Sequence, residues 1–319
     1  MLIADTGIMA GSVSGGCLEA DVREVALSVM RSGIPQLLHY DTGPDDETPF
    51  GLGLGCNGAV DILVQCASAP EFFETSRRLA LLLQGDEAFA VSTIVRGPEG
   101  VGRSIVLSTD GRPVGSTGDA KLDLVIAARA SDLLRTGISQ LHYFDTHLVF
   151  TEIQLPPPAL VIVGAGEDTR PLATSATDVG FRVTVVDHRP AYLTRDHYPA
   201  GTRLVKARAD SDISALALGP RVYAVVKTHS LDHDREWIRR LLASDVAYIG
   251  VLGARARIQG MLRELDAEDD DRIFGPVGLD IGADGPEQIA VSVVAELLAV
   301  ISAREAGHLR AREGFIHAG

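Results

Sequence analysis

Apolar and polar positions alternate along the second half of the chain in blocks that predict strands and helices in turn. Short runs that are almost wholly apolar, such as 159–164 and 222–227, are typical of buried strands. The segments between them carry an apolar residue every three or four positions, as amphipathic helices do. The pattern predicts strands at 159–164, 181–187, 203–207, 222–227 and 247–253, and helices at 166–180, 212–218, 232–243, 255–265 and 286–303. This alternation predicts that residues 159–319 form an α/β domain, a Rossmann-like doubly wound parallel sheet.

The first half of the chain contains an internal repeat. Displaced by 104 positions, Arg31–Thr42 lies over Arg135–Thr146 with seven identical residues in twelve. The second copy predicts strands at 89–95, 104–108, 140–144 and 148–153 and a helix at 122–134. Residues 1–154 are therefore predicted to form a duplicated α+β domain with mostly antiparallel strands. The linker, 154–159, contains three consecutive prolines, which favour an extended spacer.

The first copy begins late in the repeat. Its residues 1–4 match the second strand of the later copy, and nothing matches the strand at 89–95. An exposed sheet edge would result, which proteins usually avoid. We therefore expect the natural polypeptide to begin upstream of Met1.

Composition and charge exclude several classes of partner. The 319 residues carry 29 Lys and Arg against 43 Asp and Glu, a net charge of −14, which argues against nucleic acid and against anionic membrane surfaces. No run approaches the ~18 apolar residues of a membrane helix. Three cysteines in a chain this long are not a disulfide framework, and they fit a reducing, cytoplasmic location.

Residues found in only one copy of the repeat are the candidates for chemistry. Cys17 lies over Lys121, and the glycines before it, Gly15 and Gly16, have no counterpart glycines. A thiol at the start of a helix has its thiolate stabilised by the helix dipole. Cys56 lies in a glycine-rich loop that the second copy lacks, whereas Cys66 is expected to end a strand as a core residue. Two such thiols are able to bind molybdenum or carry sulfur, and packing of small residues is the alternative.

A second candidate site follows the first strand of the Rossmann-like half. Gly164 and Gly166 open a helix directly after this strand, and Asp187 ends the next strand. This context predicts a nucleotide-type ligand, with its phosphate on backbone N–H groups, its ribose on Asp187 and a further phosphate near Arg189. The third glycine of the dinucleotide motif is absent, so glycines that only permit close packing are the alternative.

Five motifs in chain order carry a resemblance to a known family: GSVSGGCLE, GLGLGCNGAVDILV, GAGEDTRPLA with FRVTVVDHRP, AYIGVLGARAR and GPVGLDIGADGPEQ. Together they resemble the XdhC/CoxI family of accessory proteins, which mature xanthine dehydrogenase and related molybdenum hydroxylases. The resemblance implies a molybdenum-cofactor chaperone that supports sulfuration and insertion of the cofactor, as molybdopterin or its nucleotide form. It also implies a molybdenum hydroxylase such as xanthine dehydrogenase and a cysteine desulfurase as partners, and a homodimer.

Carried onto this sequence, the resemblance implies a set of site residues. Cys17 and Cys56 would do the chemistry, and Cys17 is the possible molybdenum contact. The cofactor-binding residues would be Ser14, Gly15, Gly16, Glu19, Gly55, Gly58, Gly164, Gly166, Asp187, Arg189, Gly278 and Asp280.

Other interpretations remain open beside this one. An NAD(P)-dependent oxidoreductase would use the same Rossmann-like pocket, with His229 or Tyr248 as the acid or base. A thiol-based regulatory binding protein would use its cysteines as switches. The group Asp232, His233 and Asp234 is interpreted as a solvated helix start with a capping Asp, and metal binding there is the less favoured alternative.

Overall fold

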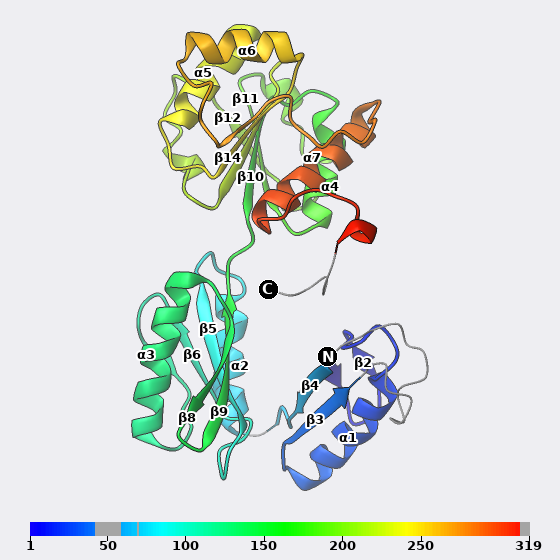
Figure 1. The fold of residues 1–319 in the computed structure, drawn as a ribbon, viewed down its shortest axis with the longest axis vertical. Helices are drawn as coiled ribbons and strands as arrows, with labels where there is room; N and C mark the ends of the chain where they lie inside the picture. Colours follow the sequence, from blue (N-terminus) through cyan, green and yellow to red (C-terminus); the bar gives the residue numbers. More distant parts are fainter. Residues whose placement is uncertain (42–58, 69, 313–319) are drawn as a thin grey trace. The chain divides into compact units, whose positions relative to one another are not determined.

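The protein divides into two compact units. A computed structural model describes residues 1–41, 59–68 and 70–312, and the chain forms the units Met1–Pro156 and Pro157–Gly319 (Figure 1). The boundary falls within the predicted proline linker. Among the described residues, no helix has the length and apolar character needed to cross a membrane.

The second unit is built on a six-stranded sheet in which all strands run parallel. In space the order is β12-β11-β10-β13-β14-β15. The strands are β10 (Ala159–Val163), β11 (Arg182–Asp187), β12 (Arg203–Lys206), β13 (Val222–Val226), β14 (Tyr248–Val251) and β15 (Ile273–Phe274). The helices are α4 (Thr169–Asp178), α5 (Leu231–Leu242), α6 (Arg255–Glu264) and α7 (Pro286–Ile301), and short 3-10 turns lie at Pro190–Tyr192, Arg195–His197, Ser214–Leu216 and Leu309–Ala311.

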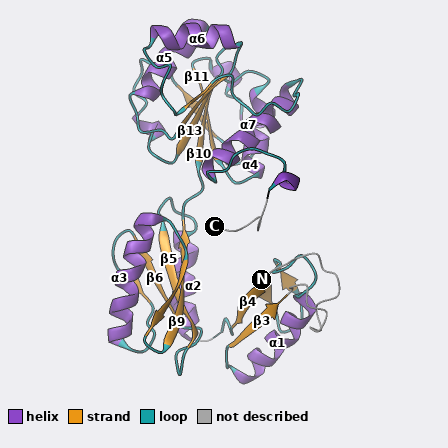
Figure 2. Ribbon diagram, in the orientation of Figure 1, coloured by secondary structure: helices purple, strands orange, loops and turns teal. Residues whose placement is uncertain are grey.

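Helices cover both faces of this sheet (Figure 2). One buried cluster includes Ile238 of α5 and Ile258 of α6, and a separate cluster includes Leu172 of α4 and Leu297 of α7. The predicted doubly wound α/β fold is therefore confirmed. Because β11 and β13 flank β10 on opposite sides, the chain reverses its direction across the sheet there, and ligands of such folds bind beyond the carboxyl ends of these strands.

Two predicted helices of this unit differ from the observed ones. The helix expected at 166–180 begins only at Thr169, since the residues before it form the turn that leaves β10. The helix expected at 212–218 is wrong, and only the 3-10 turn at Ser214–Leu216 forms. There the Asp212 side chain accepts the Ser214 N–H at 2.9 Å, and Ala217 adopts a positive φ of 47°, which ends the turn.

The second copy of the repeat forms a five-stranded antiparallel sheet in the order β7-β6-β5-β9-β8. Helix α3 covers one face, burying Ile126 and Ala130, and α2, which the apolar pattern did not predict, packs Leu82 on the other. The elements are α2 (Pro70–Leu82), β5 (Phe89–Arg96), β6 (Ser104–Ser108), β7 (Pro113–Val114), α3 (Ala120–Thr136), β8 (Gln140–Phe144) and β9 (His147–Gln154).

The first copy repeats these elements, except for β5 and α2, within the described residues. Its elements are β1 (Leu2–Ile3), β2 (Met9–Ala10), α1 (Glu19–Ser32), β3 (Gln36–Asp41) and β4 (Ala59–Val64). The displacement of 104 positions relates the buried residues of α3 (Leu122, Ile126, Ala130, Leu133) to the buried residues at α1 (Leu18, Val22, Ala26, Val29). The described strands pair only as two separate ribbons, β1 with β2 and β3 with β4.

Candidate functional site

The loop that leads into α1 is organised around the carboxylate of Glu19. Its Oε1 accepts hydrogen bonds from the Ser12 hydroxyl at 2.7 Å, the Ser14 N–H at 2.9 Å and the Val13 N–H at 3.0 Å. Its Oε2 accepts from the Ser14 hydroxyl and the Gly16 N–H, both at 2.8 Å. These bonds, that from the Ser14 N–H first, hold the pKa of Glu19 well below its usual range. The anionic Glu19 side chain therefore fixes the loop.

In the second copy a carboxylate also accepts hydrogen bonds from the loop before the helix, but this loop has no cysteine. Asp123, which lies over Glu19, accepts from the Ser116 hydroxyl at 2.6 Å and from the Thr117 N–H at 2.8 Å. There the side chain of Asp119 also caps α3 by accepting the Lys121 N–H at 2.8 Å. In the first copy the N-cap residue is Leu18, which makes no such side-chain bond. The two copies therefore share the carboxylate that holds the loop, whereas only the second copy has a side chain that caps its helix.

The two glycines in front of Cys17 leave open space beside the loop. Both have positive φ values, +75° at Gly15 and +129° at Gly16, and no atom lies within 4 Å of where a Cβ would stand. The Cys17 side chain is exposed and its thiol is free. This arrangement lets a ligand approach the backbone and a thiol together. The other members of the predicted site in this half, Gly55, Cys56 and Gly58, lie outside the described residues.

Cys66 packs against the buried cluster of α1 and β4, but it does not end the strand as expected. The strand β4 ends two residues earlier, at Val64, and the Cys66 side chain is only partly buried. Its Sγ lies 3.0 Å from the Ser68 hydroxyl oxygen.

In the second unit, Gly164 is needed for a close approach between strands. It has φ +110°, and a Cβ there would lie 2.4 Å from the backbone oxygen of Lys227, at the end of β13. At Gly166 a Cβ would lie 2.7 Å from Oδ1 of Asp168. The first contact is with backbone, so packing alone accounts for Gly164, as the alternative interpretation had it.

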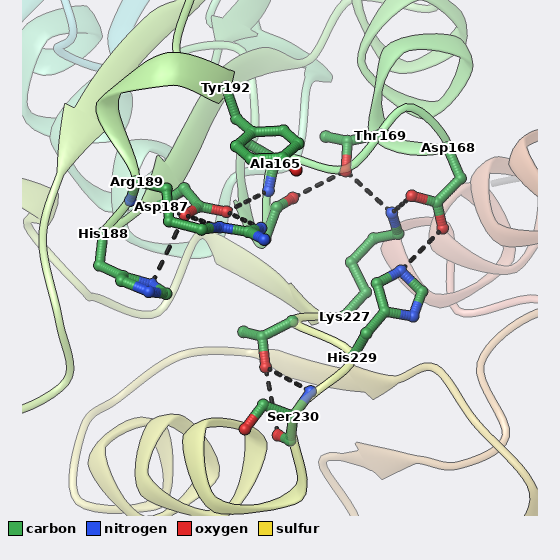
Figure 3. Close-up of polar contacts among 12 residues, drawn as sticks. Ala165, Asp168, Thr169, Asp187, His188, Arg189, Tyr192, Lys227, His229 and Ser230 are labelled. Atoms are coloured by element: carbon green, nitrogen blue, oxygen red, sulfur yellow. Dashed lines mark hydrogen bonds and ion pairs between the residues drawn. The ribbon is translucent and has the colours of Figure 1, made fainter.

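Asp187 and Arg189, predicted to bind ribose and phosphate, bind each other (Figure 3). The Arg189 Nε donates to Oδ1 of Asp187 at 3.0 Å and a terminal nitrogen donates to Oδ2 at 2.9 Å. Burial would raise the pKa of Asp187, but these bonds, with those from the N–H groups of Arg189 and Ala165, lower it to about 2. The Arg189 guanidinium also stacks 4.1 Å above the Tyr192 ring. Both residues line a pocket of about 50 Å³ at the carboxyl ends of β10, β11 and β12.

A buried lysine at the same sheet edge was not among the predicted site residues. The Lys227 ammonium lies 2.6 Å from Oδ1 of Asp168 and donates to the Thr169 hydroxyl at 2.8 Å (Figure 3). Burial lowers the pKa of Lys227, and the ion pair with Asp168 opposes this shift. His229 completes the group, with its Nε2 3.4 Å from the second oxygen of Asp168. The available signal was a lysine that directly follows the buried strand Val222–Val226.

The Lys227–Asp168 pair also borders a second, mostly apolar pocket of about 140 Å³. This pocket lies between the carboxyl ends of β13 and β14 and the helices α4 and α7, where Leu172 and Val293 line it. A ligand there would meet apolar walls and one ion pair.

Gly278 and Asp280, both predicted cofactor contacts, differ in environment. A Cβ at Gly278 would lie 2.4 Å from the Ser292 hydroxyl oxygen, and its N–H donates to Glu296 at 3.0 Å. Asp280 is exposed. The Glu296 carboxylate also accepts the hydroxyl of Tyr248, whose pKa is raised by burial and by Glu296. Tyr248 is wholly buried, so the interpretation of Tyr248 as a proton donor to a substrate is wrong.

The helix start at Asp232–Asp234 is only partly the solvated group that was expected. Asp232 is exposed and pairs with Arg235 at 2.6 Å. Asp234, by contrast, is 1% exposed; it accepts the Thr228 N–H at 2.9 Å and pairs with Arg257. Within the described ranges, no group of three or more His, Cys, Asp or Glu residues is placed to hold a metal ion.

Comparison with known proteins gives concordant matches. Residues 160–297 match the XdhC Rossmann domain, and residues 1–41 and 82–145 match the XdhC and CoxI family. A Bacillus subtilis (strain 168) protein described as a probable subunit of xanthine dehydrogenase is 33% identical over 302 residues, 93% of this chain and 86% of that protein. An uncharacterized Escherichia coli (strain K12) protein, YqeB, is 34% identical over 158 residues, 48% of this chain and 29% of that protein.

A solved structure extends the similarity to three dimensions. A crystal structure described as a xanthine dehydrogenase from Bacillus halodurans superposes with a TM-score of 0.76 at 27% identity, over 98% of this chain and 87% of that one. The chain therefore belongs to the XdhC and CoxI family.

Proposed function

We propose that this protein is an accessory factor in the maturation of a xanthine dehydrogenase or a related molybdenum hydroxylase. In this role it binds the molybdenum cofactor, supports its sulfuration by a cysteine desulfurase, and delivers it to the client enzyme in the cytoplasm. Membership of the family and the description of the Bacillus subtilis relative support the accessory role. The finer steps rest on the chemistry of this chain's own residues.

The observation that carries the proposal is the exposed Cys17 thiol beside two open glycines. A thiolate is a soft ligand and matches molybdenum better than a carboxylate or a carbonyl oxygen does. Cys17 directly precedes Leu18, the N-cap residue of α1, so its side chain lies at the entrance of the helix. Glu19 holds the loop through five hydrogen bonds, so the thiol is presented from a fixed backbone. When bound, the cofactor supplies the metal centre and a phosphate.

A separate candidate site for an anion such as a phosphate lies in the second unit, at the turn between β10 and α4. Among the described residues, no protein acceptor is found for the backbone N–H groups of Gly166, Glu167 and Asp168, which precede the helix. The two acidic side chains of this turn are already paired, Glu167 with Arg170 at 2.8 Å and Asp168 with Lys227 at 2.6 Å. Their charges are thus balanced, and the helix dipole attracts an anion.

The test compares Cys17 with the residue that replaces it in the other copy of the repeat. Wild type, Cys17→Ser and Lys121→Ser are purified from cells that make the cofactor, and molybdenum and pterin are measured per chain. Lys121 is exposed at the matched position of α3, so Lys121→Ser is the control for a change at the entrance of a helix. We expect Cys17→Ser to lose at least nine-tenths of the bound molybdenum and Lys121→Ser to keep it. Equal molybdenum and pterin contents in all three proteins would contradict the proposal.

A further inference from the structure

An apolar groove separates the two ribbons of the first copy. It has a volume of about 490 Å³, and its walls are Leu2 and Ile3 of β1 on one side and Ile62 and Val64 of β4 on the other, with α1 alongside. Within the described residues, β1 pairs only with β2 and β4 only with β3. Each of the two strands therefore turns a backbone edge without a pairing partner toward the groove.

The second copy shows what occupies the corresponding place. There β5 lies between β6 and β9 and pairs antiparallel with both. The displacement of 104 positions puts β1 over β6, and the pairing with the preceding strand puts β4 over β9, because Leu38 pairs with Ile62 as His142 pairs with Val149. The groove between β1 and β4 is thus the position of β5.

Matched residues of the two copies differ in exposure beside the groove. Leu2 is 64% exposed, whereas its counterpart Val106 is 0% exposed, because Phe89 of β5 and Leu82 of α2 pack against it. Large apolar side chains at a strand edge are normally covered, since they otherwise promote aggregation.

We propose that this groove is an acceptor site for one extended polypeptide strand, which pairs antiparallel with β1 and β4 at once. The occupant is a strand with the side-chain pattern of β5. The inward positions of β5 are Ala90, Ser92 and Ile94, and each is 1% exposed. The occupant therefore needs small or apolar residues at the matching positions. Two facing edges of backbone N–H and C=O groups need peptide groups repeated at strand spacing, and only a polypeptide supplies them.

The register of the occupant follows from the repeat. Ser92 pairs with Ile105 and Thr151, so its counterpart in the groove lies between Met1 and Val64. The residue that corresponds to Ile94 faces Ile62. The occupant also approaches the candidate site, because Val13 of the Cys17 loop lines the same groove. This inference is independent of the cofactor proposal.

The first test supplies the strand in trans. A labelled peptide with the sequence of residues 89–96 (FAVSTIVR) is added to the full chain, and binding is followed by fluorescence anisotropy. The control peptide carries Ser92→Asp and Ile94→Asp, which place charges on the inward face. We expect the control peptide to bind at least tenfold more weakly. Equal binding of the two peptides would overturn the proposal, since it would reflect non-specific adhesion.

The second test supplies the strand in cis, where a short connection raises its effective concentration. Residues 89–104, which carry β5 and its own turn, are fused directly before Met1, because Met1 corresponds to Ile105, and hydrogen exchange is measured over residues 1–10 and 59–68. We expect at least tenfold slower exchange in β1 and β4 than in a fusion that carries the same two Asp substitutions. If neither peptide binds in trans, the fusion decides the question. Unchanged exchange in both segments would then refute the acceptor site.

Discussion

Replacing Asp187 with Asn tests whether the Asp187 carboxylate stabilises the fold, as its pairing with Arg189 indicates, or is needed only for binding a ligand. Asn keeps the size and one acceptor oxygen, which suffices for the Ala165 N–H, but it removes the charge that pairs with Arg189. The Asp187 side chain is 3% exposed and that of Arg189 is 41% exposed, so water screens this ion pair from the arginine side only. The perturbation thus tests how much the pair stabilises the folded second unit.

The magnitude follows from the pKa of Asp187. Folding lowers this pKa from 3.8 to about 2, and each pKa unit corresponds to about 1.4 kcal/mol, so the ionised group stabilises the fold by about 2 kcal/mol at pH 7. Because the folded pKa is the lower one, this stabilisation is present above pH 3.8 and is lost as the pH falls toward 2. Roughly half of it should remain at pH 3.

The assay uses the single tryptophan of the chain. Trp237 lies in α5 and is 4% exposed, so its fluorescence reports unfolding of the second unit. Urea unfolding at pH 7 and pH 3 is compared for wild type, Asp187→Asn and the control Asp269→Asn, which changes an exposed carboxylate. We expect Asp187→Asn to destabilise by about 2 kcal/mol at pH 7 and by roughly half as much at pH 3. A loss below about 0.5 kcal/mol at pH 7, or one that does not shrink at pH 3, would refute the reasoning.

Two further predictions use the same fluorescence assay at pH 7. Gly164→Ala should destabilise the second unit by about 3 kcal/mol or more, because the added Cβ would lie 2.4 Å from a backbone oxygen. The control Gly180→Ala, also at positive φ but with nothing within 4 Å of the added Cβ, should cost only about 1 kcal/mol. Similar losses in the two variants would show that backbone strain at positive φ, and not crowding, dominates. Lys227→Met should cost about 3 kcal/mol by leaving Asp168 without its cation, and adding Asp168→Asn should restore part of this loss. Additive effects of these two changes would contradict a direct ion pair.

The sequence allowed accurate prediction wherever local pattern and burial agree. The strands at Val222–Val226 and Phe89–Arg96 are apolar enough that few other structures accommodate them, and their predicted bounds differ from the observed ones by one residue. Prediction failed for the segment around Ser214, where the Asp212 side chain accepts the Ser214 N–H and a turn replaces a helix. Such competition depends on a single hydrogen bond, which periodicity does not report.

The candidate site divides in the same way. The repeat identified Cys17, Gly15 and Gly16 as departures from a shared scaffold, and the structure places an exposed thiol beside open backbone there. The matching carboxylate of Asp123 was the available signal that Glu19 serves the scaffold, whereas the resemblance gave Glu19 a role in binding the cofactor. Motif reasoning gave Asp187 a role in binding ribose, whereas the fold pairs it with Arg189.

By itself the sequence determined the two-part organisation, the parallel sheet of the second unit and the duplication in the first, because these follow from the spacing of apolar residues along the chain. Only the tertiary structure decided which polar groups neutralise one another. Lys227 and Asp168, 59 positions apart, meet because β10 and β13 are neighbours in the sheet. The strength of an ion pair depends on distance and burial in space, and neither quantity can be read from the order of residues.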